Sequence, residues 1–265
     1  MARKRFIEHN SARVCFQIEG RGQVLVLLHG FLENMDIFQR FSEELSKKYR
    51  VLLIDLPGHG QSEMQAESHT MELMAESVNA VIDHLEIEKA VMIGHSMGGY
   101  VALTFAEKYM QKLSGLGVFH SHALADTTEA KINRGRAIQV VKEHHKDFIS
   151  SFIPDLFTKR NQDRLSEEIK ELQAAARTIP KESVIASLEG MRQRTDKLRL
   201  LNTMRIPMLF IIGKQDPRTP LEKMMHQISL PKHAEILILD DVAHMGYLED
   251  FDTTVGFVEG FVGRV

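Results

Sequence analysis

The sequence predicts an α/β fold: a mostly parallel, doubly wound sheet interrupted by one helical insertion. Short apolar runs, typical of strands buried on both faces of a sheet, alternate with longer segments of helical periodicity. Such alternation favours parallel strands with helices on both sides. Between residues 122 and 202 the strand signal stops, and the sequence is charged and helical in pattern. So long a segment is expected to be folded helices rather than a loop.

In the first half of the chain, strands are expected to alternate with helices. The first strand, residues 14–18, precedes a tight turn at residues 20–22. The basic residues 3–5 are interpreted as part of a solvated terminus. Further strands are expected at residues 24–28, 51–54, 90–93 and 116–119, and helices at 36–48, 70–85 and 97–109.

In the second half, the insertion comes before the last strands. It is expected to contain helices at residues 129–145, 162–177 and 181–192. Strands return at residues 208–212 and 236–239, and a last helix is expected at 253–262. The predicted domains are a core of residues 1–121 and 203–265, and a helical unit of residues 122–202.

Composition and charge exclude several partner classes. Lys and Arg total 33 and Asp and Glu 36 among 265 residues, a formal net charge of −3. Proteins that bind nucleic-acid backbones concentrate positive charge, so no nucleic-acid partner is expected. No apolar run reaches the roughly 18 residues that a membrane span needs, so no membrane partner is expected either. Cys15, the single cysteine, is interpreted as a small core residue and favours a reducing, cytoplasmic location.

The residues Gly94-His95-Ser96-Met97-Gly98 form the pattern G-x-S-x-G between a predicted strand and a predicted helix. In that context the serine stands on a sharp turn and exposes its hydroxyl above the edge of the sheet. The glycines remove side chains that would collide there. Ser96 is therefore the candidate nucleophile; the alternative is a small-residue turn that only lets strand and helix pack.

A nucleophilic serine needs a base, and the base needs an acid to orient it. His244 follows the last predicted strand, and Asp216 follows the strand at 208–212. All three candidates lie beyond the carboxyl ends of strands, where parallel sheets bind ligands. Asp216 could instead be a turn former before a proline, with Asp240 or Asp241 as the acid.

The oxyanion of a tetrahedral intermediate needs hydrogen-bond donors. The backbone N–H groups of Phe31 and Met97 are expected to form this oxyanion hole, since such holes pair the residue after the nucleophile with an earlier loop. His29-Gly30 could alternatively be a plain strand-ending turn.

With these motifs the chain resembles the α/β-hydrolase superfamily along nearly its whole length. The resemblance implies a serine nucleophile, a helical cap over the active site and no cofactor. It points to the branch of small-molecule esterases, enol-lactonases, carbon–carbon bond hydrolases and cofactor-free haloperoxidases. Ser96 argues against the dehalogenases and epoxide hydrolases, which use aspartate. The matching segments are residues 29–31, 55–62, 94–99, 213–216 and 243–244.

Several residues near these motifs are candidates for the substrate pocket: His29, His95, His120, His122 and Met245. For His120 and His122, polar packing beneath the cap is the simpler interpretation. No metal site is expected, because H-E-x-x-H is absent and adjacent histidines in a helix point apart. A basic run late in the insertion is interpreted first as a solvated helix face. The second interpretation is that its charges attract an anionic substrate. The run comprises Arg192, Arg194, Lys197 and Arg199.

Three functions remain open on the sequence alone. The first is a serine hydrolase of a small carboxylic ester, lactone or thioester. The second uses the same triad for carbon–carbon bond hydrolysis or peracid formation. The third is a ligand-binding sensor on a hydrolase scaffold. A small-molecule partner is expected in each case, and the oligomeric state is left open.

Overall fold

A computed structural model describes residues 3–265. Its centre is one sheet of eight strands in the order β1-β2-β4-β3-β5-β6-β7-β8. Strands β1, β2 and β4 pair antiparallel, and all further pairs are parallel. The strands are β1 (Arg5–His9), β2 (Ala12–Gly20), β3 (Val24–Leu28), β4 (Arg50–Ile54), β5 (Ala90–His95), β6 (Leu113–Phe119), β7 (Met208–Gly213) and β8 (Ala234–Leu239).

Helices cover the central strands, which are buried along their length because both faces are packed. Helix α1 packs on α11 and β4, and α2 packs on α3. The helices are α1 (Gln39–Leu45), α2 (Met71–His84), α3 (Met97–Tyr109), α4 (Thr128–Phe152), α5 (Lys159–Arg164), α6 (Ser166–Ala176), α7 (Lys181–Gln193), α8 (Leu198–Thr203), α9 (Leu221–Ile228), α10 (Gly246–Glu249) and α11 (Phe251–Val262), with 3₁₀ turns at Met35–Phe38, Met110–Lys112 and Pro154–Leu156.

The structure corrects the expectation for the N-terminal segment. Strand β1 pairs antiparallel with β2, so Arg5, although exposed as expected, begins a strand that was not predicted. The strand lies at the edge of the sheet, and its side chains are exposed or half-buried. An edge strand of this kind lacks the continuous apolar run by which a buried strand is recognised.

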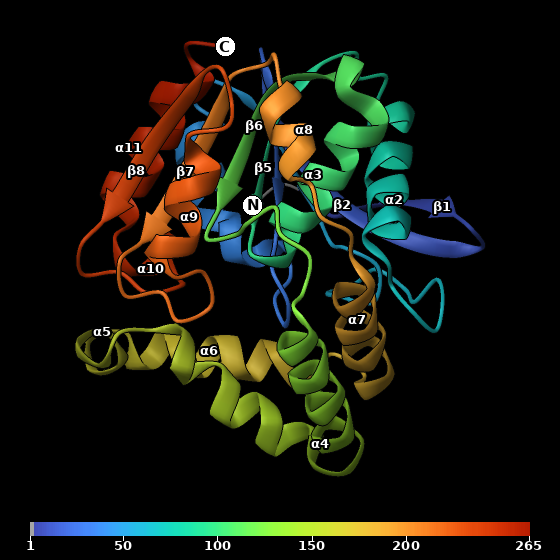
Figure 1. The fold of residues 1–265 in the computed structure, drawn as a ribbon. Coiled ribbons are helices and arrows are strands. Elements are labelled where there is room, and N and C mark those ends of the chain that lie inside the picture. Colours follow the sequence, from blue (N-terminus) through green and yellow to red (C-terminus); the bar gives the residue numbers. More distant parts are fainter. Residues whose placement is uncertain (1–2) are drawn as a thin grey trace.

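The inserted segment gathers beyond the carboxyl ends of the parallel strands, where Figure 1 shows α4, α5, α6 and α7 together. Helix α4 extends to Phe152, past the expected end at residue 145, with a non-helical break at His144 (φ −134°, ψ 49°). Helix α8, which falls inside the predicted helical unit, lies instead beside α3 of the core (Figure 1). Lys197, at the start of α8, pairs with Glu107 of α3 (2.5 Å). The division into core and cap remains a prediction.

Candidate active site

Ser96 lies on a strained turn between β5 and α3. Its backbone dihedrals are φ +50° and ψ −116°, which a residue with a side chain adopts only where its surroundings impose them. Its N–H donates to the Phe119 carbonyl (2.9 Å). A Cβ on Gly94 would lie 2.1 Å from the Gly98 carbonyl oxygen, and one on Gly98 would lie 2.3 Å from the Leu28 carbonyl oxygen. Only glycine fits at either position of the motif.

Ser96, His244 and Asp216 form a continuous chain of hydrogen bonds. His244 Nε2 lies 2.8 Å from Ser96 Oγ, and His244 Nδ1 lies 2.7 Å from Asp216 Oδ2. Because a carboxylate only accepts, the neutral imidazole carries its proton on Nδ1 and donates it to Asp216. Nε2 then presents a lone pair that accepts the Ser96 hydroxyl proton.

Asp216 is surrounded by donors. Its Oδ1 accepts from the backbone N–H groups of Arg218 (2.7 Å) and Thr219 (3.2 Å). Its Oδ2 accepts from the Thr219 hydroxyl as well as from His244. Burial would raise the pKa of this carboxyl, but His244 and His120 hold it well below its ordinary value of 3.8. Asp216 is therefore a carboxylate that can orient the base.

The loop that carries His244 is tied to the inserted helices. Glu249 Oε1 accepts from the backbone N–H groups on either side of His244 (3.0 and 3.1 Å). The other oxygen of Glu249 accepts from the Thr158 N–H (3.1 Å). The N–H of His244 itself donates to the Leu156 carbonyl (2.9 Å). Thus the insertion helps to fix the backbone of the candidate base.

A second buried carboxylate connects the loops of the site. Glu33 Oε2 accepts from the Gly30 N–H (2.5 Å) and from His95 Nδ1 (3.0 Å), while Oε1 accepts from the Tyr247 hydroxyl (3.1 Å). His95 Nε2 lies 2.9 Å from the backbone carbonyl of His244. Since a carboxylate and a carbonyl both only accept, both ring nitrogens of His95 carry protons.

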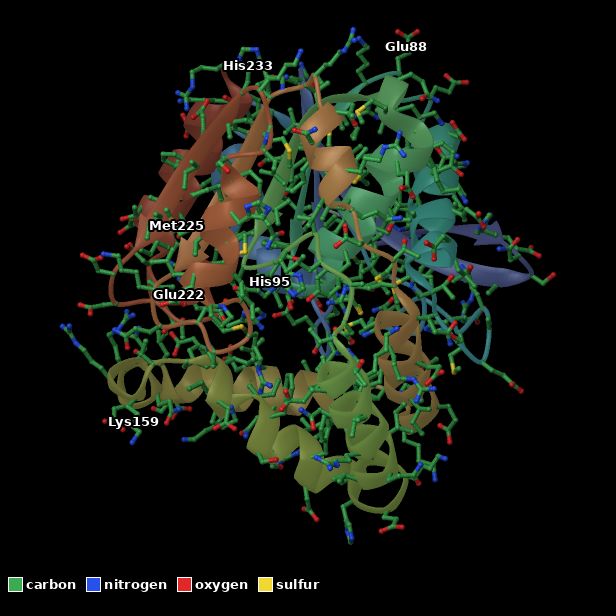
Figure 2. All side chains as sticks on the ribbon, in the orientation of Figure 1. Glu88, His95, Lys159, Glu222, Met225 and His233 are labelled. Atoms are coloured by element: carbon green, nitrogen blue, oxygen red, sulfur yellow. The ribbon has the colours of Figure 1, made fainter. Side chains whose placement is uncertain are left out.

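His95 and Glu33 are therefore a buried ion pair, with side chains 1% and 2% exposed. Burial disfavours both charged forms, but their mutual attraction raises the pKa of His95 above 6.5 and lowers that of Glu33 below 4.5. Figure 2 shows His95 in the interior, at the end of the sheet that faces the inserted helices. The pair joins the turn of Ser96 to the loops of residues 30 and 244.

The backbone N–H group of Met97 directly follows Ser96, and that of Phe31 lies in the loop after β3. Within residues 3–265, neither donates a hydrogen bond to another protein group. Met97 begins α3, whose N-terminal N–H groups and dipole favour negative charge. A Cβ on Gly30, the neighbour of Phe31, would lie 3.0 Å from Ser96 Cβ. Two unpaired donors thus stand close to the candidate nucleophile.

A cavity of about 550 Å³ opens above Ser96 and His244. The core contributes to its lining, and so do the inserted helices. Its apolar lining includes Phe31, Phe148, Phe152, Leu156, Leu188 and Met191. The cavity is large enough for a small organic substrate.

Of the five candidate pocket residues, His122 lines this cavity. His29, His95, His120 and Met245 do not, and each is at most 1% exposed. The expectation that these four line the pocket is corrected: His29, His95 and His120 lie at strand ends, where a side chain can also be buried beneath the cavity, and Met245 is buried in the loop after β8.

Two of the buried histidines support the loops of the site. His29 Nε2 accepts from the Leu56 N–H (2.9 Å). The ring nitrogens of His120 lie 3.2 Å from the backbone N–H groups of Gly213 and Gly246, and 3.5 Å separates its Nδ1 from Asp216 Oδ2. His120 therefore braces the loops of the candidate acid and base.

The basic run is not a uniformly solvated face. Arg194 and Lys197 are only 6% and 7% exposed. Arg194 pairs with Asp126 (2.6 Å) and lines the cavity, whereas Arg199 is exposed. The helix ends before Arg194, so helical periodicity could not predict which way these side chains point.

Glu33 and Glu249 were not predicted from the sequence. Nothing in the local pattern marks them, because each acts through contacts with distant segments.

Among residues 3–265 no cluster of three or more His, Cys, Asp or Glu side chains could hold a metal ion. In the same part of the chain, no helix combines the length and apolar character that crossing a membrane requires.

Comparison with known proteins places the chain among hydrolases. A family model described as alpha/beta hydrolase fold matches residues 23–251. The acetyltransferase component of the acetoin cleaving system of Pseudomonas putida is 29% identical over 88% of the chain, which spans 62% of that relative's length. A pimeloyl-[acyl-carrier protein] methyl ester esterase of Xanthomonas campestris is 27% identical over 93% of the chain and 97% of the relative.

Solved structures agree with this assignment. A thermophilic esterase from Thermogutta terrifontis superposes with a TM-score of 0.94 at 29% identity, covering 99% of both chains. The similarity thus extends over the whole fold, inserted helices included.

Proposed function

The chain belongs to the α/β-hydrolase fold family and is a hydrolytic enzyme, and we propose that it is a serine esterase. Its substrate is a small carboxylic ester, lactone or thioester, cleaved through an acyl-enzyme on Ser96. The names of the Xanthomonas and Thermogutta relatives support ester hydrolysis. The single observation that carries the proposal is the hydrogen-bonded chain from Ser96 through His244 to Asp216.

The first half of the reaction forms the acyl-enzyme. Ser96 Oγ attacks the substrate carbonyl as its proton passes to His244 Nε2. The imidazolium so formed is stabilised by the Asp216 carboxylate. The N–H groups of Phe31 and Met97 donate to the tetrahedral oxyanion. The intermediate collapses when His244 gives its proton to the leaving group.

The second half releases the acid. Water attacks the acyl carbonyl as His244 takes its proton, and the same oxyanion hole stabilises the second intermediate. His244 then returns a proton to Ser96. Residues 122–202 act as a cap in this proposal, since the cavity is lined from both sides. We assign the enzyme to the cytoplasm, which its single cysteine supports.

The test is hydrolysis of 4-nitrophenyl butyrate by the wild type and by Ser96→Ala. We expect the variant to lose at least about a thousandfold in kcat with little change in thermal stability. Ser166→Ala, which makes the same change at an exposed residue of α6, is the matched control. Equal rates in wild type and Ser96→Ala would eliminate the mechanism.

Carbon–carbon bond hydrolysis with the same triad is the second candidate. A 2-hydroxy-6-oxononadienedioate/2-hydroxy-6-oxononatrienedioate hydrolase of Paraburkholderia phymatum, 27% identical over 95% of the chain and 91% of the relative, favours it. Turnover of a vinylogous diketone faster than that of any ester in a panel would identify this chemistry.

A further inference from the structure

The charges that line the cavity are unbalanced. Its lining includes four cationic side chains, Arg134, Arg194, Arg218 and Lys223, against the carboxylates of Glu33 and Asp126. Glu33 is already paired with His95, so Asp126 alone remains to neutralise the cations.

Asp126 neutralises only part of this charge. Its Oδ2 accepts from Arg134 Nε (2.5 Å) and its Oδ1 lies 2.6 Å from Arg194 Nη1. Two guanidinium groups thus share one carboxylate. Burial would raise the pKa of Asp126, but the two arginines lower it, so the carboxylate remains charged.

Arg218 and Lys223 have no carboxylate of their own. Within residues 3–265, no Asp or Glu oxygen lies within 4.0 Å of either side chain's charged nitrogens. Asp155 and Asp216 act on Arg218 only from longer range. The Arg218 guanidinium packs over the Phe152 ring (4.6 Å to the centroid). A contact of this kind uses none of the guanidinium N–H donors, which remain available for an oxyanion.

Tyr100 adds a neutral donor. The Leu124 N–H donates to His122 Nδ1 (3.2 Å). Burial and, to a smaller extent, the charge of Arg194 lower the pKa of His122 to about 3. The neutral ring therefore carries its proton on Nε2, 3.2 Å from Tyr100 Oη, and donates it there. The hydroxyl proton of Tyr100, which lines the cavity, is left for a ligand.

We propose that the substrate of this esterase carries an oxyanionic group, a carboxylate or a phosphate, which Arg218 binds, with Lys223 and the Tyr100 hydroxyl as further donors in the lining of the same cavity. The apolar part of the cavity lining accommodates the carbon chain that separates the anion from the reacting ester. This inference rests on the proposed esterase function and narrows its substrate class.

The test compares three 4-nitrophenyl esters with six-carbon acyl chains: neutral hexanoate, the adipate half-ester with a terminal carboxylate, and hexanoate with a terminal phosphate. We expect kcat/KM of the wild type to be at least about tenfold higher for one of the charged esters, the size of one charge-assisted hydrogen bond. Whichever charged ester is preferred identifies the anion. Added salt should reduce the preference.

The variant Arg218→Gln should lower the ratio of kcat/KM, charged over neutral, by about tenfold. The matched control Arg136→Gln removes an exposed arginine of α4 that does not line the cavity and should leave the ratio unchanged. Thermal unfolding of both variants checks folding. Equal kcat/KM for all three esters, or an unchanged ratio in folded Arg218→Gln, would overturn the inference. Ser96-dependent turnover of neutral hexanoate would leave the proposed function standing in either case.

Discussion

Replacing Glu33 by glutamine removes one charge from the buried network beneath the site and changes little else in size. The carboxylate accepts from the Gly30 N–H, from His95 Nδ1 and from the Tyr247 hydroxyl. A glutamine can keep the first two bonds through its carbonyl oxygen, while its amide group donates to a reoriented Tyr247. The charge that stabilises the His95 imidazolium is lost.

The cost follows from the burial of the pair. With side chains 1% and 2% exposed, His95 and Glu33 are hardly screened by solvent, and removing one partner of a buried pair costs about 3 kcal/mol or more. In a chain of 265 residues this corresponds to a melting temperature lower by roughly 6 to 12 °C. We expect kcat to fall by about tenfold to a hundredfold, because the loops of Gly30 and His244 shift against Ser96.

The pH dependence of the loss distinguishes an ion pair from simple packing. The raised pKa of His95 stabilises the fold fully below pH 6.5, and this contribution is lost as pH rises through the folded-state pKa. The lowered pKa of Glu33 stabilises it above pH 4.5, and this contribution is lost as pH falls through the folded-state pKa. The difference between wild type and Glu33→Gln is therefore largest between those two values.

The assay is urea unfolding at several pH values, combined with esterase kinetics. Glu63→Gln is the control: Glu63 forms an exposed salt bridge with Arg13, and its replacement should change stability by at most about 1 kcal/mol. A Glu33→Gln variant as stable and as active as the control, or a loss of stability that does not vary with pH, would refute the reasoning.

Three further predictions concern single residues. Gly98→Ala should lose about 3 kcal/mol of unfolding free energy, because its Cβ would lie 2.3 Å from the Leu28 carbonyl oxygen. Gly256→Ala, whose Cβ would have nothing within 4 Å, should gain about 0.5 to 1 kcal/mol. Equal urea midpoints for the wild type and both variants would contradict this. Asp216→Asn should lower kcat by about 10⁴-fold, and full activity in the variant would refute the role of Asp216. The variant should also be less stable than the wild type above pH 3.8, and the difference should shrink as pH falls through the lowered pKa of Asp216 in the folded wild type. Burial and nearby charge raise the pKa of Cys15 to about 12, so Ellman's reagent should react only after unfolding, and rapid labelling of the folded protein would show the thiol to be accessible.

The parallel strands could be predicted because each is a continuous apolar run, and the order of strands and helices followed from them. The strand pattern also predicted that Ser96, Asp216 and His244 lie at one edge of the sheet, since each follows the carboxyl end of a strand. Strand β1 could not be recognised, because an edge strand with exposed side chains such as Phe6 (42% exposed) resembles a polar terminus.

The residues that support the site could not be predicted from the sequence, for a different physical reason. Glu33 and Glu249 act through partners that the fold brings from distant segments, and no local pattern marks such contacts. His95 and His120 sit at strand ends as a pocket residue would, but their side chains point beneath the cavity. The arginines of the cavity come from separate segments, so their common charge appears only in three dimensions.

Covalent labelling by a fluorophosphonate tests the central claim most directly, because it requires a hydroxyl activated by a neighbouring base. Tandem mass spectrometry of the labelled protein should place one adduct on Ser96, and His244→Ala should slow labelling by at least about a hundredfold. An enzyme that hydrolyses esters while Ser96 stays unlabelled, or one whose labelling is indifferent to His244, would contradict the account.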